Sequence, residues 1–163
     1  MPRPFAATVL ASAALACGQL YAQTPAPLGP RDFRVAGIAV GADSSEARRV
    51  LGAPLRITSQ VDPYDGQGAW IDWHYRTVRL SYFGLAKVAA FSLTTRRAAT
   101  ARGLRVGDTR ARTRALYGAP SQDNTADGED AWVYRKSQDD GLFMKVIFVQ
   151  DRVTKIYVGY SPD

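Results

Sequence analysis

An internal repeat constrains the fold of this chain more than any other feature of its sequence. Segments Ile38–Pro54 and Leu104–Pro120 share a Val-Gly element and, at the same spacing, a Gly-Ala-Pro element. Two further pairs of segments correspond downstream: Trp73–Arg76 with Trp132–Arg135, and Val88–Phe91 with Val153–Ile156. Self-similarity of this kind is typical of a supersecondary unit that is used more than once. We therefore predict two repeats, residues 35–95 and residues 96–163.

Each repeat is predicted to begin with a short helix. The first helix starts at Asp43 or Ser44, where Asp43 and Glu46 have the spacing of a capping box, and the second starts at Thr109. A Gly-Ala-Pro sequence ends each helix, because glycine tolerates positive φ and proline cannot continue the helix. Both helices are too short to be stable without tertiary packing.

Three strands are predicted to follow each helix. Alternating apolar and polar residues predict strands over 69–76, 78–83 and 87–93, and over 131–136, 142–149 and 152–160. Leu55–Val61 is a further strand candidate, and hairpin turns are expected around Gly84 and at Gln150-Asp151. The predicted fold class is α+β: two tandem units, each a helix plus a three-stranded antiparallel β-meander, packed into one domain with a continuous or closely apposed sheet.

The N-terminus has the features of an export signal. A charged start at Arg3 precedes the short apolar run Phe5–Ala16, and small residues lie before Gln23. This pattern predicts a signal peptide over residues 1–22, followed by a Pro-rich linker over residues 23–34. Cys17 follows a small-residue box, so it is either a lipidation site or a cysteine inside an ordinary signal. The expected location is the periplasm, with outer-membrane anchoring if Cys17 is lipidated.

The repeated motifs resemble a known family. The succession of Val40-Gly41, a capped helix, Leu51-Gly52-Ala53-Pro54 and Trp73-His74-Tyr75 resembles the SmpA/OmlA type of small outer-membrane lipoprotein. Two such units in one chain resemble the tandem arrangement of the β-lactamase inhibitory protein. The resemblance covers Ile38 to Tyr160 and implies a role in outer-membrane assembly or in enzyme inhibition. The chain departs from the inhibitory protein because its predicted mature part has no cysteine and so no disulfide.

Little in the sequence favours catalysis. His74 is the only histidine, so a histidine relay or a cluster of histidine metal ligands cannot form. The carboxylates Asp62 and Asp65 lie in a turn sequence, and the acidic segment Asp123–Asp130 lacks the ligand order of a calcium loop. We therefore expect a protein that is not an enzyme and that holds no cofactor or metal.

A sheet face is the first candidate for partner binding. If Trp73, Tyr75, Trp132 and Tyr134 face the helices, their neighbours face the other side of the sheet. Trp, Tyr and Arg dominate the energetics of protein interfaces. The predicted partner-binding residues are Trp70, His74, Arg76, Arg79, Phe83, Arg135, Lys145, Lys155 and Tyr157. Their partner would be a protein of the bacterial cell envelope. The alternative is that the two copies fold over this face and bury it, or that a register shift of one residue swaps the two sides.

An arginine run gives the alternative function. The formal net charge is +6, which favours anionic partners. The candidate anion-binding residues are Arg96, Arg97, Arg102, Arg105, Arg110 and Arg114. Their partner would be an anionic lipid or a cell-wall polymer. Nucleic acid is not expected as the partner of an exported protein. Pairing of these arginines with nearby acidic loops is the other interpretation.

Overall fold

The computed structural model describes residues 25–61, 68–83, 87–124, 129–137 and 141–160. It begins with the 3-10 helix η1 (Pro30–Phe33) and the small β1 (Arg34–Val35) and β2 (Ile38–Ala39) hairpin. The two α-helices are α1 (Ser44–Leu51) and α2 (Arg110–Tyr117). The remaining strands are β3 (Arg56–Val61), β4 (Ala69–His74), β5 (Arg79–Phe83), β6 (Val88–Leu93), β7 (Gln122–Asp123), β8 (Ala131–Arg135), β9 (Leu142–Val149) and β10 (Arg152–Tyr160).

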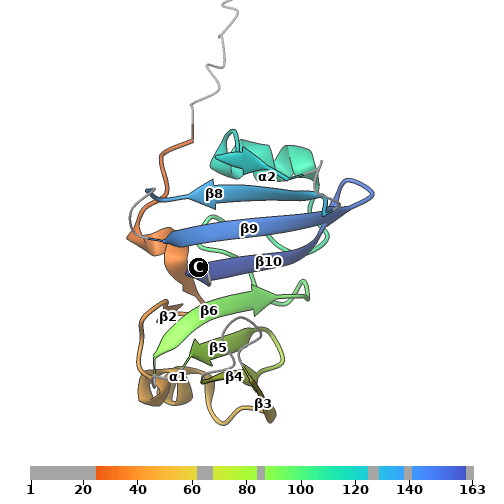
Figure 1. Cartoon of the computed structure of the whole chain (residues 1–163). Coiled ribbons are helices and arrows are strands. Elements are labelled where there is room, and N and C mark those ends of the chain that lie inside the picture. The colour runs from red at the N-terminus through yellow and green to blue at the C-terminus, as the bar shows by residue number, and fades with distance from the viewer. Residues whose placement is uncertain (1–24, 62–67, 84–86, 125–128, 138–140, 161–163) are drawn as a thin grey trace, which may run out of the picture.

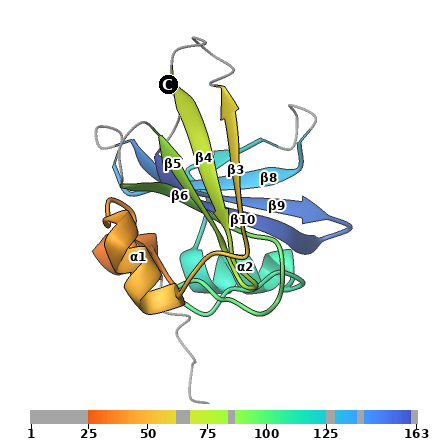
Figure 2. The same cartoon turned by 90° about the horizontal axis from the view of Figure 1, so that it is seen from below.

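One antiparallel sheet dominates the structure. Its eight strands follow the order β3-β4-β5-β6-β10-β9-β8-β7, and Figure 1 shows them stacked from β3 to β8. The strands of the N-terminal and C-terminal parts join through β6 and β10, which pair from Leu93 with Ile156 to Ala90 with Gly159. The sheet is strongly twisted: Figure 2 shows that β3 and β4 cross β8 and β9 at a steep angle.

This topology corrects the predicted fold class and the predicted family resemblance, both of which are wrong. The chain is mainly β, with one continuous eight-stranded sheet, not two tandem units of a helix and a three-stranded meander. A separate three-stranded unit would leave β6 and β10 with a free edge, and their pairing removes both edges. The motifs behind the resemblance to SmpA/OmlA lipoproteins and to the inhibitory protein describe helix ends and core aromatics, which do not specify how strands combine.

The core lies between the two helices and one face of the sheet. Both α-helices pack on the same side, as Figure 2 shows. Trp73, Trp132 and Tyr134 are buried on this side, which confirms their predicted orientation toward the helices. Tyr75 is half-buried after the end of β4, and its hydroxyl donates to the Gly52 carbonyl at 3.4 Å. The core face is therefore occupied, and the opposite face carries the other side-chain set of each strand.

The two helices differ in how they begin, and they end alike. Thr109 caps α2 as predicted, because its hydroxyl accepts a hydrogen bond from the Arg112 N–H at 3.1 Å. Asp43 occupies the same position before α1, but its side chain makes no capping hydrogen bond, so the predicted capping box is wrong. Gly52 and Gly118 end the helices with φ of 79° and 78°, as predicted.

Local strand predictions agree well with the structure. The predicted ranges of β9 and β10 match the observed ones, and Gln150-Asp151 forms their turn with φ of 49° and 62°. A two-residue turn with two positive φ angles fits the twist of a hairpin. The turn predicted at Gly84, the signal peptide and Cys17 lie outside the described residues. Within the described ranges, no helix is long and apolar enough to cross a membrane.

Candidate functional site

The face of the sheet opposite the helices, called the open face below, carries most of the predicted partner-binding residues. Cross-strand pairing places His74 beside Arg79, Arg79 beside Ser92, Ser92 beside Tyr157 and Tyr157 beside Lys145. These pairs form one row across five strands. Eight of the nine predicted residues lie on this face: Trp70, His74, Arg79, Phe83, Arg135, Lys145, Lys155 and Tyr157. The ninth, Arg76, lies at its margin in the connection between β4 and β5.

Small residues occupy the centre of the open face. Ser81 lies beside Ala90, and Ala90 lies beside Gly159, on the three central strands β5, β6 and β10. A Cβ atom added to Gly159 would lie 2.5 Å from the Ala90 Cβ, so the close approach of β6 and β10 requires glycine here. Ser92 is 1% exposed although α1 and α2 both pack on the other side of the sheet.

Two aromatic pairs flank this centre. Trp70 and Phe83 are cross-strand partners with ring centroids 5.1 Å apart. Phe143 and Tyr157 stack at 5.3 Å on the other side, and the Arg135 guanidinium lies over the Phe143 ring at 5.7 Å. Aromatic pairs of this geometry hold each ring in a fixed position. Sequence reasoning missed Phe143, although its alternation with Lys145 in β9 would have placed it on the same face.

Polar contacts fix the charged side chains between the aromatic pairs. Asp72 accepts a hydrogen bond from the Ser81 hydroxyl at 2.6 Å and pairs with Arg79 at 3.4 Å. Arg79 also donates to the Ser92 hydroxyl at 3.2 Å, and Lys145 pairs with Glu129. Both carboxylates are thus engaged within the protein. The open face presents more basic than acidic groups to a partner.

His74 is held in its neutral form. Its Nε2 lies within hydrogen-bond distance of the Thr58 hydroxyl, at 2.9 Å. Burial lowers the pKa of His74 below its usual value, and the charges of Arg56 and Arg79 lower it further against the opposing effect of Asp72. Because the pKa falls below 6.5, the imidazole is neutral at pH 7. The charge of the face therefore comes from its arginines and lysines.

A pocket of about 250 Å³ lies at the margin of the open face. It is formed where the β4–β5 connection meets the end of β6 and the β10 strand. Its lining consists of His74, Tyr75, Arg76, Thr77, Val78, Arg79, Thr94, Thr95 and Lys155. Four of the predicted partner-binding residues meet here, including Arg76. Thr94 and Thr95 gave no signal in the sequence, because their position depends on which strand pairs with β6.

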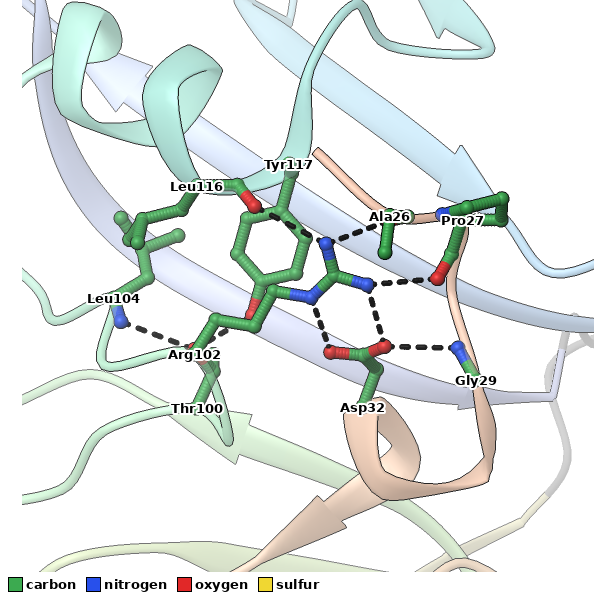
Figure 3. A network of polar contacts seen from close by, with 9 residues as sticks. All are labelled: Ala26, Pro27, Gly29, Asp32, Thr100, Arg102, Leu104, Leu116 and Tyr117. Atoms are coloured by element: carbon green, nitrogen blue, oxygen red, sulfur yellow. Dashed lines mark hydrogen bonds and ion pairs between the residues drawn. The ribbon is translucent and has the colours of Figure 1, made fainter. Parts of the chain in front are cut away.

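The alternative arginine site is not gathered at one place, and Arg102 is engaged inside the protein. Its Nε and Nη2 donate to the two Asp32 oxygens at 2.7 and 2.8 Å. Its remaining N–H groups reach the carbonyls of Ala26, Pro27 and Leu116, as Figure 3 shows. All five guanidinium donors are therefore used. Hydrogen bonding to the Asp32 carboxylate raises the pKa of Arg102, so it stays charged.

The other five arginines of that set have separate environments. Arg110 donates to Asp130 at 2.6 Å and to Asp151 at 3.1 Å, and Arg114 lies 5.1 Å from the Trp132 ring centroid. Arg105 donates to the Arg96 carbonyl at 3.0 Å. The Arg96 side chain lies 3.8 Å from Asp108, and Arg97 is exposed. Three of the six predicted anion-binding residues, Arg96, Arg102 and Arg110, are thus paired with carboxylates of the protein.

Among the described residues, no group of three or more His, Cys, Asp and Glu side chains is placed to hold a metal ion. Asp62, Asp65 and part of the acidic segment Asp123–Asp130 lie outside the described residues.

Comparison with known proteins gives no family. No protein family profile matches the chain, and no curated protein matches it. One solved structure with a similar fold is the crystal structure of a cysteine-rich secretory protein from Staphylococcus aureus subsp. aureus Mu50. It is 13% identical with a TM-score of 0.47, and the match covers 81% of this chain and 48% of that chain. This chain therefore spans about half the length of that protein.

Proposed function

We propose that this chain is an exported, non-enzymatic binding protein of the bacterial cell envelope that recognises a protein partner through the open face. The observation that carries the proposal is the placement of two aromatic pairs, Trp70 with Phe83 and Phe143 with Tyr157, on one face of a single sheet. Aromatic side chains and arginine supply most of the binding energy in protein interfaces.

The open face is organised before any partner arrives. Ring contacts fix the aromatic pairs, and the Ser81, Asp72 and Arg79 contacts fix the charges between them. Association is costly when side chains must be ordered on binding, so a face with fixed side chains loses less affinity to that cost. The strands below this face are paired on both sides from β4 to β8, which makes the support rigid.

The charge of the face indicates the chemistry of the partner. Arg79, Arg135, Lys145 and Lys155 lie on it, whereas Asp72 and Glu129 are already paired with Arg79 and Lys145. An acidic surface with apolar side chains at its centre would complement this arrangement.

Affinity capture from cell-envelope extract tests this function. The mature chain is compared with the Trp70→Ala, Tyr157→Ala double variant and with Arg112→Ala, whose exposed side chain lies on α2. We expect a discrete protein that binds the wild type and the Arg112 variant, and whose affinity for the double variant falls at least tenfold when measured with both proteins purified. Circular dichroism confirms that all three chains are folded.

Two results would overturn the proposal. Equal binding to the wild type and the double variant would place the interface elsewhere. Recovery of lipid or cell-wall polymer without a protein, lost steeply with rising salt, would favour the arginine side chains outside the open face.

A further inference from the structure

The pocket at the margin of the open face combines several cations with hydrogen-bond donors. Arg76, Arg79 and Lys155 line it, and no carboxylate among the described residues does. Within the described part of the chain, neither Arg76 nor Lys155 takes part in an ion pair. Asp72, the carboxylate paired with Arg79, lies outside the lining and also accepts from Ser81. The pocket therefore has an excess of positive charge.

Arg79 has a donor that the protein leaves unused. Its Nη1 lies near Asp72 and its Nη2 donates to Ser92, but its Nε is buried without a hydrogen-bond partner. A buried donor without an acceptor is less favourable than a satisfied one. Because no solvent-sized group reaches Nε in this structure, Arg79 contributes to the pocket through its positive charge and its place in the lining.

Neutral groups complete the lining. The hydroxyls of Thr77, Thr94 and Thr95 come from two separate connections, and His74 adds an imidazole. Hydroxyl, guanidinium and ammonium groups together donate from several directions. A tetrahedral oxyanion has oxygens that accept from several directions, whereas a planar carboxylate has only two oxygens. The donor set therefore favours a phosphate-like group over a carboxylate.

From these contacts we infer that this pocket is a binding site for a tetrahedral oxyanion, a phosphate group above all, held by Arg76, Arg79 and Lys155. A phosphate ester carries a charge of about −1.5 to −2 at pH 7, which matches the two unpaired cations. The pocket opens at the margin of the open face, so a molecule that carries the phosphate would extend over that face. This inference does not depend on the proposed function, because a small anion fills the pocket with or without a protein partner.

The single histidine gives a direct test. His74 lines the pocket and is the only histidine in the chain, so its imidazole proton resonances report binding without overlap. Inorganic phosphate is titrated at constant ionic strength with sodium chloride as the balancing salt. A bound anion stabilises the imidazolium form, and we expect a saturable shift of these resonances together with a rise in the pKa of His74.

Variants assign the response to the pocket. The Arg76→Gln, Lys155→Gln double variant loses two charged donors, and we expect its phosphate affinity to fall at least about tenfold. Arg112→Gln on α2 removes an exposed arginine outside the pocket and should bind phosphate as the wild type does. Isothermal titration calorimetry gives the same affinities by a method independent of His74.

Three outcomes would overturn the inference, and one further titration identifies the source of the phosphate. Absence of a saturable response, or an equal response to chloride, would overturn it. Unchanged phosphate binding by the Arg76, Lys155 variant in its folded state would overturn it as well. A parallel titration with glycerol 3-phosphate distinguishes the source of the group: tighter binding than inorganic phosphate identifies a carried phosphate, and equal binding identifies the free ion, both of which support the site.

Discussion

Arg102 and Asp32 form a bidentate ion pair between positions 70 residues apart in the chain, with N–O distances of 2.7 and 2.8 Å. The same guanidinium binds the carbonyls of Ala26 and Pro27, and that of Leu116 near the end of α2. It therefore fastens the segment before η1 to the second helix. The Arg102 Cζ also lies 4.9 Å from the centroid of the Tyr117 ring.

Loss of Arg102 should destabilise the protein strongly. Asp32 is 6% exposed, so Arg102→Ala leaves a buried carboxylate without its cation. Breaking a buried pair in this way costs about 3–5 kcal/mol. Urea unfolding of the variant should show this loss, whereas Arg97→Ala, which removes an exposed side chain, should change the free energy of unfolding by less than about 0.5 kcal/mol. Equal midpoints for the two variants would contradict the structural role of Arg102.

A side chain at Gly159 should weaken the junction of β6 and β10. The added Cβ meets the Ala90 Cβ at 2.5 Å and the Ala89 carbonyl oxygen at 2.7 Å, so the strands must separate. Gly159→Ala should lower the free energy of unfolding by about 1–3 kcal/mol. Ala90→Gly in the same chain should restore part of it, because it removes one of the colliding groups. The matched control is Gly29→Ala, where nothing lies within 4 Å, and a loss as large there would disprove the steric cause.

Local features of this fold were predictable from the sequence, and its assembly was not. Alternation persists through Leu142–Val149 and Arg152–Tyr160, so the ranges of β9 and β10 could be predicted to the residue. The joining of β6 to β10 depends on Ala90 and Gly159 lying opposite each other. Two small residues far apart in sequence carry no periodic signal, so the sequence did not indicate which strands join the two parts of the sheet.

The candidate site also has a part that was predictable from the sequence and a part that was not. Membership of the open face follows from the period of two along each strand, so Trp70 and Tyr157 could be assigned to it once Trp73 was placed in the core. The pocket required Thr94 and Lys155 to meet across β6 and β10, which only the strand order determines. Arg102 belonged to a charge run in the sequence, and its buried partner Asp32 lies in a different part of the chain.

His74 should make stability depend on pH in a defined direction. Its folded pKa lies below the 6.5 of an unfolded chain, because burial and the charges of Arg56 and Arg79 outweigh Asp72. Between these two pKa values the unfolded chain binds more protons, so stability is full above pH 6.5 and falls as the pH drops below it. Urea midpoints measured from pH 7.5 to 5 should fall for the wild type more than for His74→Gln. A wild-type midpoint that rises toward pH 5 relative to the variant would reverse the sign and refute the assignment.

The two helix N-termini give a paired test of capping. The Thr109 hydroxyl accepts from the Arg112 N–H, whereas the Asp43 side chain makes no capping bond and lies only near Lys87 at 3.9 Å. Thr109→Ala should therefore cost about 1 kcal/mol of unfolding free energy. Asp43→Ala should cost less than about 0.5 kcal/mol, because an exposed ion pair contributes little. Urea unfolding at one pH and salt concentration compares the two directly. A larger loss at Asp43 would mean that its carboxylate caps α1 in solution, and the difference between the two helices would then disappear.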